Sequence, residues 1–473
     1  MVFGPLSAVL LAAAPPDTIS LVAGMVISRS VVVRPGIYRL TPLPGDSAVV
    51  RVRGSDVVVD FGGAHLIGAP PSAPPDRASG VAILIEGGSD VTLKRARVSG
   101  YRVGLLARRV RALRLHDNDF SHNWKPRLYS GFGHESLADW LSFHHNEKDE
   151  WLRHGAALHL VEVDGGEIRG NIARQGMNGL LLVRTNRLRI WNNDFSFNSG
   201  LGIGMYRSSD NVVMHNRADY CIRGYVHGVY NRGQDSAALL IYEQSLRNTV
   251  AYNSMTHGGD GLFLWAGQST MDSGQGGAND NLFFGNDFSF AATNGIEATF
   301  SRNRFVGNLI EGAHHGMWGG YSFQSEVRGN VFRRNTVGVA IEHGQDNAIV
   351  ANRFEANQTA VRLWWNPTEP SDWGYPKHRD TRSRDYRIAG NTFTGDRVAL
   401  RVENTQRVVA SANGFAGVDT AIVAVGDTTG WSSQTADRRP AARLEGVVAN
   451  CLTSCLTSTL LFAASSASSI NVS

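Results

Sequence analysis

Residues 179–195 read GLLLVRTNRLRIWNNDF, and residues 338–354 repeat the same plan as GVAIEHGQDNAIVANRF. In each copy a Gly or Ala opens a short apolar strand, and fourteen residues later an Asn begins an Asn-x-hydrophobic step. The next opening residue follows eight or nine residues after the Asn. A β-rich repeat of about twenty-two residues indicates a solenoid built coil by coil. The offset is kept in five copies: Ala157 to Asn171, Gly179 to Asn193, Gly202 to Asn216, Gly316 to Asn330 and Gly338 to Asn352.

Length and composition bound the class of protein. A solenoid grows by adding coils, so the 473 residues predict one long domain over residues 17–450 rather than two or three globular domains. A hydrophobic content of 42% and 52 glycines suffice for a continuous core with many tight turns. The net charge of +4 is small for this length and argues against a nucleic-acid partner, which requires a concentrated basic face.

The two ends of the chain carry no repeat. Residues 1–16 contain an apolar run that ends in three alanines before two prolines, which predicts a signal segment and a secreted or periplasmic protein. Residues 451–473 are predicted as a C-terminal tail. The three cysteines offer neither a disulfide framework nor zinc spacing, and leave only a Cys451 to Cys455 bridge open. No apolar stretch reaches the roughly twenty residues of a membrane span.

Two short motifs precede the regular repeat, which runs from about Val91 to Asn450. Residues 35–38 read Pro-Gly-Ile-Tyr, and residues 60–63 read Asp-Phe-Gly-Gly. In these motifs and in the repeat, the sequence resembles the pectin-lyase-like superfamily of right-handed parallel β-helices. The resemblance implies an all-β, right-handed parallel β-helix solenoid with coils of about 22 residues. That superfamily includes polysaccharide lyases, glycoside hydrolases, uronan epimerases and non-enzymatic binding proteins, so the fold alone does not select a function.

Within each coil, the turn Asn and the following Phe are predicted to be structural. Stacked coils would place each Asn above the last, so that its amide bonds the next amide and the backbone of the turn. The Phe two residues later would stack inside the solenoid. The predicted ladder and stack comprise Asn118, Asn193, Asn286, Asn330, Asn352 and Asn391 with Phe120, Phe195, Phe288, Phe332, Phe354 and Phe393.

Four insertions interrupt the coils beside the first strand. Segments 124–154 and 220–235 precede a first strand, whereas segments 267–280 and 366–385 follow one. Loops on both rims of one sheet predict a walled groove over that sheet. The first insertion carries a polar cluster whose spacing fits no known metal-site signature, so it is predicted as a charged lid rather than a metal site. Its members are Asp139, His144, His145, Glu147, Asp149, Glu150 and His154.

Alternation along the first strand predicts which side chains face the groove. Counting the opening Gly or Ala as position one, positions two and four are apolar and face the core, and positions three and five face outward. A row of exposed aromatic side chains predicts a surface for stacking sugar rings, with cover by the inserted loops as the alternative. The outward residues of the middle coils are Tyr206, Tyr242, Phe263, Trp265, Glu297, Trp318, Glu342, Arg362 and Trp364.

Three carboxylates in this region are candidate acids and bases. Strand geometry predicts Cα separations of about 11 Å for both Asp260 to Glu297 and Glu297 to Glu342. Side-chain reach would bring either pair to the roughly 6.5–9.5 Å of an inverting glycosidase, or less readily to the 5–5.5 Å of a retaining one. Glu297 lies between Phe263 and Trp318 on the adjoining coils. Aromatic walls lower the local dielectric constant and raise the pKa of a carboxyl group, which suits Glu297 to act as an acid.

Further groups complete the candidate site. Asn294 and His315 occupy the position of Asp260 in the next two coils, and His315 is a candidate for proton transfer. The catalytic candidates are thus Glu297, Glu342, Asp260 and His315. The candidates for substrate binding are Tyr242, Glu243, Phe263, Trp265, Asn294, Trp318, Arg362 and Trp364.

Three functions remain open. The first is hydrolysis of a polysaccharide or oligosaccharide by acid and base groups. The second is β-elimination or epimerisation of an acidic glycan, often with calcium, with Arg362 pairing the uronate and Tyr242 or His315 as base. The third is a non-catalytic carbohydrate-binding or periplasmic accessory protein, resembling the β-helix modules of metal-cofactor maturation systems. The Asn-Thr-Asp, Asp-Asp and Gly-His-Gly motifs of polygalacturonases and the Asp-Pro-His of alginate epimerases are missing.

Overall fold

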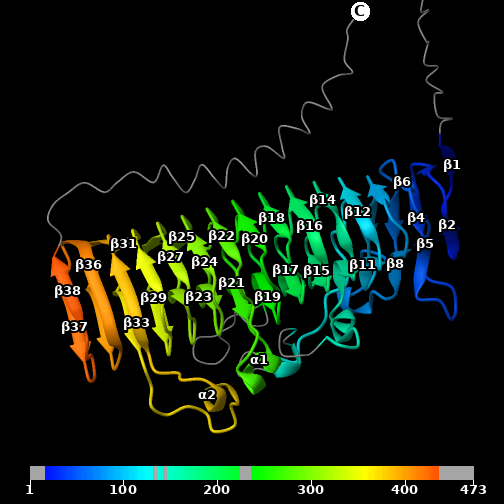
Figure 1. Cartoon of the computed structure of the whole chain (residues 1–473). Coiled ribbons are helices and arrows are strands. Elements are labelled where there is room, and N and C mark those ends of the chain that lie inside the picture. The colour runs from blue at the N-terminus through cyan, green and yellow to red at the C-terminus, as the bar shows by residue number, and fades with distance from the viewer. Residues whose placement is uncertain are drawn as a thin grey trace, which may run out of the picture. The chain divides into compact units, whose positions relative to one another are not determined.

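The computed structural model describes residues 16–435, except residues 131–133, 135, 140, 142–145 and 224–235. The predicted signal segment up to residue 15, the Cys451 to Cys455 bridge and the C-terminal tail lie outside the described residues. Strands of successive coils pair in parallel along the chain, which confirms the right-handed parallel β-helix (Figure 1). The helices of the described part are short: α1 (Gln268–Ser273), α2 (Tyr375–His378) and the 3-10 turns Pro75–Arg77, Leu137–Asp139 and Glu150–His154.

Among the described residues, the first sheet contains fifteen parallel strands, one from each successive coil. They are β2 (Met25–Ile27), β5 (Ala48–Val52), β8 (Val81–Glu86), β11 (Val103–Arg108), β13 (Ala156–Val161), β15 (Leu180–Val183), β17 (Leu201–Tyr206), β19 (Ala237–Tyr242), β21 (Asp260–Trp265), β23 (Asn294–Ala298), β26 (His315–Trp318), β29 (Val337–Glu342), β32 (Thr359–Trp364), β35 (Val398–Glu403) and β37 (Thr420–Val425).

The second and third sheets complete each coil. The second sheet contains β1 (Asp17–Ile19), β3 (Val31–Val33), β6 (Val58–Asp60), β9 (Thr92–Lys94), β12 (Arg111–His116), β14 (Asp164–Arg169), β16 (Asn186–Trp191), β18 (Val212–Met214), β20 (Thr249–Ala251), β22 (Leu282–Phe284), β24 (Arg304–Val306), β27 (Glu326–Arg328), β30 (Ala348–Val350), β33 (Arg384–Ala389) and β36 (Gln406–Ala416), with β38 (Ser432–Thr435) joined to it. The third contains β4 (Ile37–Arg39), β7 (His65–Ile67), β10 (Arg97–Ser99), β25 (Leu309–Glu311), β28 (Val331–Arg333), β31 (Arg353–Glu355) and β34 (Thr392–Thr394). Single bridges continue the third sheet between Arg97 and Leu309.

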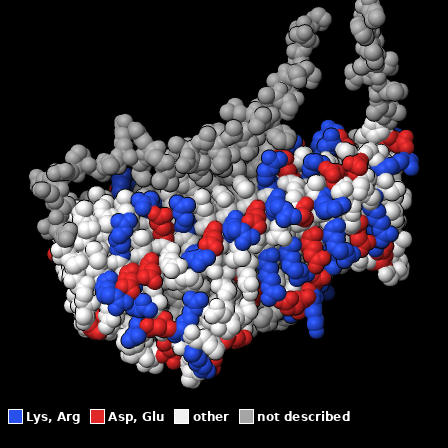
Figure 2. All heavy atoms as spheres, in the orientation of Figure 1, with Lys and Arg blue, Asp and Glu red and all other residues white. Residues whose placement is uncertain are grey.

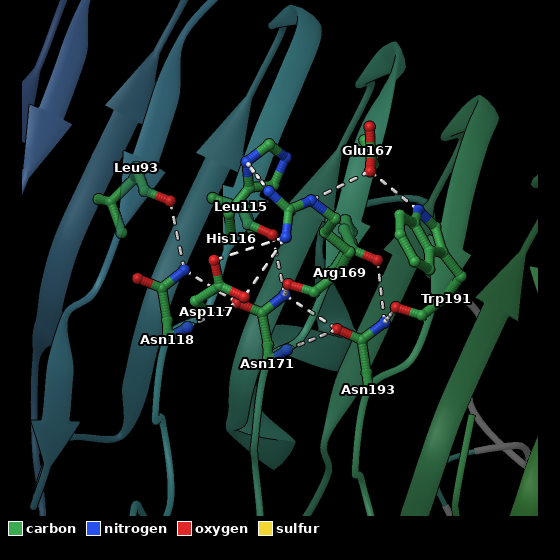
Figure 3. A network of polar contacts seen from close by, with 11 residues as sticks. Leu93, Leu115, His116, Asp117, Asn118, Glu167, Arg169, Asn171, Trp191 and Asn193 are labelled. Atoms are coloured by element: carbon green, nitrogen blue, oxygen red, sulfur yellow. Dashed lines mark hydrogen bonds and ion pairs between the residues drawn. The ribbon is translucent and has the colours of Figure 1, made fainter. Parts of the chain in front are cut away.

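A ladder of asparagine side chains joins the coils, as predicted (Figure 3). The Asn118 amide nitrogen donates to Asn171 Oδ1 at 2.8 Å, and the Asn171 amide donates to Asn193 Oδ1 at 2.9 Å. The same oxygen of Asn193 accepts the backbone N–H of Asn171. Because the amides are buried, each rung satisfies polar groups that water cannot reach. The ladder continues through Asn216, Asn253, Asn286, Asn308, Asn330, Asn352, Asn391 and Asn413.

The predicted phenylalanine stack is confirmed for Phe332, Phe354 and Phe393. Phe120, Phe195 and Phe288 are buried as predicted, but their neighbours on the other side of at least one adjoining coil are not aromatic, so the stack is not continuous. Phe354 lies parallel to Phe332 and Phe393, with ring centroids 5.3 and 4.9 Å away. A Cβ at Gly338 would lie 2.5 Å from the carbonyl oxygen of Ala360, the opening residue of the next coil. The strands approach so closely at position one that a larger side chain would push the coils apart.

Opposite charges interleave on the outer surface (Figure 2). Arg247 pairs with Asp210, Arg302 with Asp280, and Arg407 with Asp385, each across neighbouring coils. Such exposed pairs contribute little to stability because water screens them, and Figure 2 shows acidic and basic side chains alternating on this face.

A second hydrophobic cluster lies on the outer side of the first sheet and corrects one expectation. The side chains at positions three and five do leave the solenoid interior, but Tyr206 and Tyr242 are not exposed. Trp151 of the first insertion covers both rings, with centroids 5.5 and 6.1 Å away. The alternation predicted the direction of these side chains, whereas the insertion that covers them has no repeat to predict its course.

None of the helices in the described residues is long and apolar enough to cross a membrane.

Candidate functional site

A cavity of about 630 Å³ lies on the outer side of the first sheet, over strands β21, β23, β26 and β29. Its floor comes from the strands, and its far wall comes from the segment that follows β32. The lining residues are Phe263, Trp265, Gln268, Glu297, Thr299, Phe300, Trp318, Gly320, Tyr321, Glu342, His343, Asn366, Thr368, Pro370 and Trp373.

The strand register brings the predicted groove residues together. Glu297 pairs with Phe263 on one side and with Trp318 on the other, all at position three. Glu342 lies at position five of β29, two strands beyond Glu297. Of the predicted site residues, Phe263, Trp265, Glu297, Trp318 and Glu342 therefore line one cavity.

Two insertions meet to form the far wall. The Arg379 guanidinium donates to the carbonyl oxygen of Gly274 at 2.6 Å, which ties α2 to the end of α1. Next to these helices, the ring of Phe300 stacks on that of Tyr321, with centroids 4.5 Å apart, and meets the ring of Tyr375 edge-on, with centroids 4.9 Å apart. These aromatic contacts are buried, so the wall is fixed by packing rather than by surface contacts.

Glu297 is held from the sheet side. Its side chain is nearly buried, with 8% of the residue exposed, and its Oε2 accepts the amide N–H of Asn294 at 2.8 Å. The amide oxygen of Asn294 faces Nδ1 of His315 at 2.9 Å. Because Asn294 donates to Glu297, its oxygen is the acceptor, and His315 carries its proton on Nδ1.

Asp260, Asn294 and His315 form the predicted polar file, but they lie behind Glu297 rather than in the cavity. Asp260 is fully buried, and its Oδ1 accepts the backbone N–H of Asn294 at 2.8 Å. Burial, together with His314 and Arg362, lowers the pKa of His315 to about 3. His315 is therefore neutral at physiological pH and positions Asn294.

The pKa of His315 predicts a dependence of stability on pH. An unfolded chain takes up this proton near pH 6.5, whereas the folded protein resists it down to about pH 3. The unfolded state thus binds more protons in that window, so stability falls as the pH falls, by up to about 1.4 kcal/mol per pH unit. The H315Q variant keeps a donor to Asn294 and lacks the titration. Its melting temperature should fall less than that of the wild type between pH 6.5 and 4, and equal slopes would contradict the assignment.

Glu342 is held by a different set of groups. Its Oε1 accepts the indole N–H of Trp364 at 2.8 Å, and Nε2 of His343 lies 3.9 Å from the same oxygen. Nδ1 of His343 lies 3.0 Å from the carbonyl oxygen of Thr381. The segment after β32 therefore orients His343, which faces Glu342.

The other predicted substrate contacts lie outside the cavity. Tyr242 is 1% exposed beneath Trp151, and its burial raises its pKa. Glu243 is fully buried under α1, where its Oε2 accepts the hydroxyl of Ser269 at 2.6 Å. The guanidinium carbon of Arg362 lies 4.4 Å from the ring centroid of Trp364, in the coil that follows that of Glu342.

The polar cluster of the first insertion anchors that insertion to the sheet. Asp149 pairs with Arg108 at 2.9 Å, and Glu147 pairs with Arg207 at 2.8 Å. Glu147 also accepts the hydroxyl of Tyr206. His144 and His145 lie outside the described residues. Across the part of the chain that the structure describes, no group of three or more His, Cys, Asp and Glu side chains is placed to hold a metal ion.

Sequence reasoning missed the wall of the cavity. Phe300, Tyr321 and His343 lie just after first strands, where the position count stops, and Trp373 lies inside an insertion. Their common signal is an aromatic or imidazole ring that follows a first strand by one to three residues or lies in the loop beside it, and only the folded chain shows that these rings converge.

Three solved structures illustrate the likeness to known proteins. The A-module of mannuronan C-5 epimerase AlgE6 from Azotobacter vinelandii is 12% identical, with coverage of 88% of this chain and 92% of that chain and a TM-score of 0.40. A DFA-IIIase from Arthrobacter chlorophenolicus A6 is 13% identical, with coverage of 70% and 83% and a TM-score of 0.39. The surface adhesin PfbA of Streptococcus pneumoniae is 11% identical, with coverage of 76% and 85% and a TM-score of 0.41.

No curated protein matches the sequence. A family profile matches residues 71–289 and 230–406, which together cover well over half of the chain. The protein therefore belongs to the family described as periplasmic copper-binding protein (NosD).

Proposed function

We propose that the protein is an exported carbohydrate-active enzyme that hydrolyses glycosidic bonds in the cavity over the first sheet. The observation that carries the proposal is that Glu297 and Glu342 line one cavity walled by aromatic rings. The faces of Trp265, Trp318 and Trp373 suit the C–H faces of sugar rings, and the carboxylates suit their hydroxyl groups.

The spacing of the two carboxylates suits an inverting reaction. Two strand spacings and two residue steps separate their Cα atoms by about 11–12 Å, which side-chain reach reduces to the roughly 6.5–9.5 Å needed to admit a water molecule. Glu297, the more buried of the two, would protonate the leaving oxygen as the glycosidic C–O bond breaks. Glu342 would take a proton from the water whose oxygen bonds to the anomeric carbon.

The elimination alternative has less support. Its candidate bases are Tyr242, which is buried under Trp151, and His315, which lies behind Glu297. Arg362 lies beside the cavity and remains available to an acidic sugar.

A screen of plant, algal and bacterial polysaccharides tests the proposal. Hydrolysis predicts new reducing ends without the ultraviolet absorbance of an unsaturated uronate. That absorbance would instead indicate elimination, and tight binding without either product would indicate a binding protein.

The family description favours a second candidate, a periplasmic accessory protein that binds copper. Among the described residues no set of three or more ligating side chains fits a metal ion, so we derive no step through copper. Equilibrium dialysis against Cu⁺ and Cu²⁺, with metal analysis of the protein, tests this candidate independently of any glycan. Stoichiometric copper with no glycan turnover would favour it.

A further inference from the structure

One end of the first-sheet surface is closed beside the cavity. Trp265 stacks on Tyr242 with ring centroids 5.3 Å apart, and Tyr242 stacks on Trp151 at 6.1 Å. Tyr206 meets Trp151 edge-on at 5.5 Å, and Tyr206, Tyr242 and Trp151 are all buried. A chain that lies along the sheet therefore cannot continue past Trp265 toward the N-terminal coils, because rings of the protein already fill that space.

The rim at the carboxyl ends of the strands is closed as well. The segment after β32 runs from Asn366 to Trp373 and then enters α2. The ring centroid of Trp373 lies 5.9 Å from those of both Phe300 and Tyr321. There α2 meets α1 through the bond from Arg379 to Gly274. A smaller cavity of about 210 Å³ continues under this junction and shares Trp265, Phe300 and Trp373 with the larger one.

The surface on the other side of Glu342 carries groups that suit a sugar chain. The ring of Trp364 lies on this side, with its centroid 5.5 Å from that of Trp318 in the cavity, and Arg362 lies over the ring of Trp364. Arg362 pairs in register with Arg401 of the next coil, and their side chains are 38% and 42% exposed. Both arginines contact Glu403, so two cations share one carboxylate and leave a net positive charge.

We propose that the cavity receives the end of a glycan chain, and that the rest of the chain leaves over Trp364, Arg362 and Arg401. This inference rests on the proposed hydrolysis. About 630 Å³ is within the range of pockets that enclose a ligand of disaccharide size. The enzyme would therefore remove short units from one end of its substrate and would not cut internal bonds.

The test uses linear hexasaccharides of the glucose, xylose, mannose, galacturonate and mannuronate series, each labelled at the reducing end. Chain-end cleavage predicts one short product from the first turnover and a stepwise ladder afterwards. A statistical mixture of sizes from the first turnover would overturn the inference while leaving hydrolysis intact. No product from any series, nor from the polysaccharide screen, would instead count against the proposed function.

A binding measurement separates recognition from turnover. With the E297Q variant, calorimetry compares a hexasaccharide with the same hexasaccharide blocked at both ends, by reduction at one end and a cyclic acetal at the other. Chain-end recognition predicts at least a tenfold weaker binding of the blocked compound. Equal affinities would overturn the inference, because an open groove binds internal residues.

A matched pair of variants tests the exit path. W364A should lower kcat on both substrates, because Trp364 donates a hydrogen bond to Glu342. It should raise the KM for the hexasaccharide more than the KM for the disaccharide, because only the longer chain extends past Glu342 over Trp364. Trp191 lies on the second sheet, where its indole bonds Glu167 (Figure 3), so W191A should leave both values unchanged. Equal changes in KM for the two substrates would show that the chain does not leave by this path.

Discussion

Replacing Glu297 by Gln is expected to lower kcat by about 10²–10⁴-fold while the Kd for the glycan stays within a few fold. Gln preserves the shape of the side chain and still accepts the N–H of Asn294, but it has no proton to transfer. Calorimetry would give the Kd, and release of reducing ends would give kcat.

Two further substitutions test the partner acid and provide a surface control. E342Q should lower kcat on the same scale, because the proposed reaction needs both an acid and a base. Glu162 lies on the outer surface, where it pairs with Arg184, so E162Q should leave kcat unchanged. Full activity of E297Q would exclude a catalytic role for Glu297. A fall in melting temperature that parallels the fall in kcat would point to a structural role instead.

Replacing Asn330 by Ala is expected to lower the free energy of unfolding by about 3–5 kcal/mol. The Asn330 side chain accepts two N–H groups of Asn308 at 2.8 and 2.9 Å, and it donates to the Phe305 carbonyl and to Asn352 Oδ1. Its removal leaves these buried groups without partners, and water cannot reach them. Denaturant unfolding followed by circular dichroism would measure the loss.

The chain itself supplies a matched control for this substitution. In a second ladder Ser325 stands where its neighbours are Asn303 and Asn347, and its hydroxyl accepts the N–H of Asn303 at 3.0 Å. N330S should therefore destabilise the protein less than N330A. Gln358 is exposed, so Q358A should change stability by no more than about 0.5 kcal/mol. Equal stability of N330A and wild type would show that the ladder does not hold the coils together.

The repeat predicted those parts of the molecule that repeat. The offset between Gly338 and Asn352 gave the strand register, and the alternation along each strand placed Trp265, Glu297, Trp318 and Glu342 on one surface. A parallel β-helix fixes these positions because each strand can bury its apolar face only against the same face of the next coil.

The parts that do not repeat were not predictable in the same way. Tyr242 occupies the same strand position as Trp265, yet only Tyr242 is covered, because Trp151 of the first insertion packs on it. The position of Asp260 makes it a candidate acid, but its side chain is fully buried, and its Oδ1 accepts the backbone N–H of Asn294. Such differences depend on how insertions of irregular sequence fold onto a regular surface, and no periodicity encodes that.

The strand β26 separates the strands of Glu297 and Glu342. Neighbouring strands are about 4.8 Å apart, so gaining or losing one whole coil between the two acids would shift one acid relative to the other by that fixed increment along the solenoid axis. The asparagine rungs would re-form on either side of the junction, since each rung meets an identical neighbour. Duplication or deletion of a single genetic unit could therefore convert an acid pair spaced for one stereochemical outcome into a pair spaced for another, without a new core having to evolve.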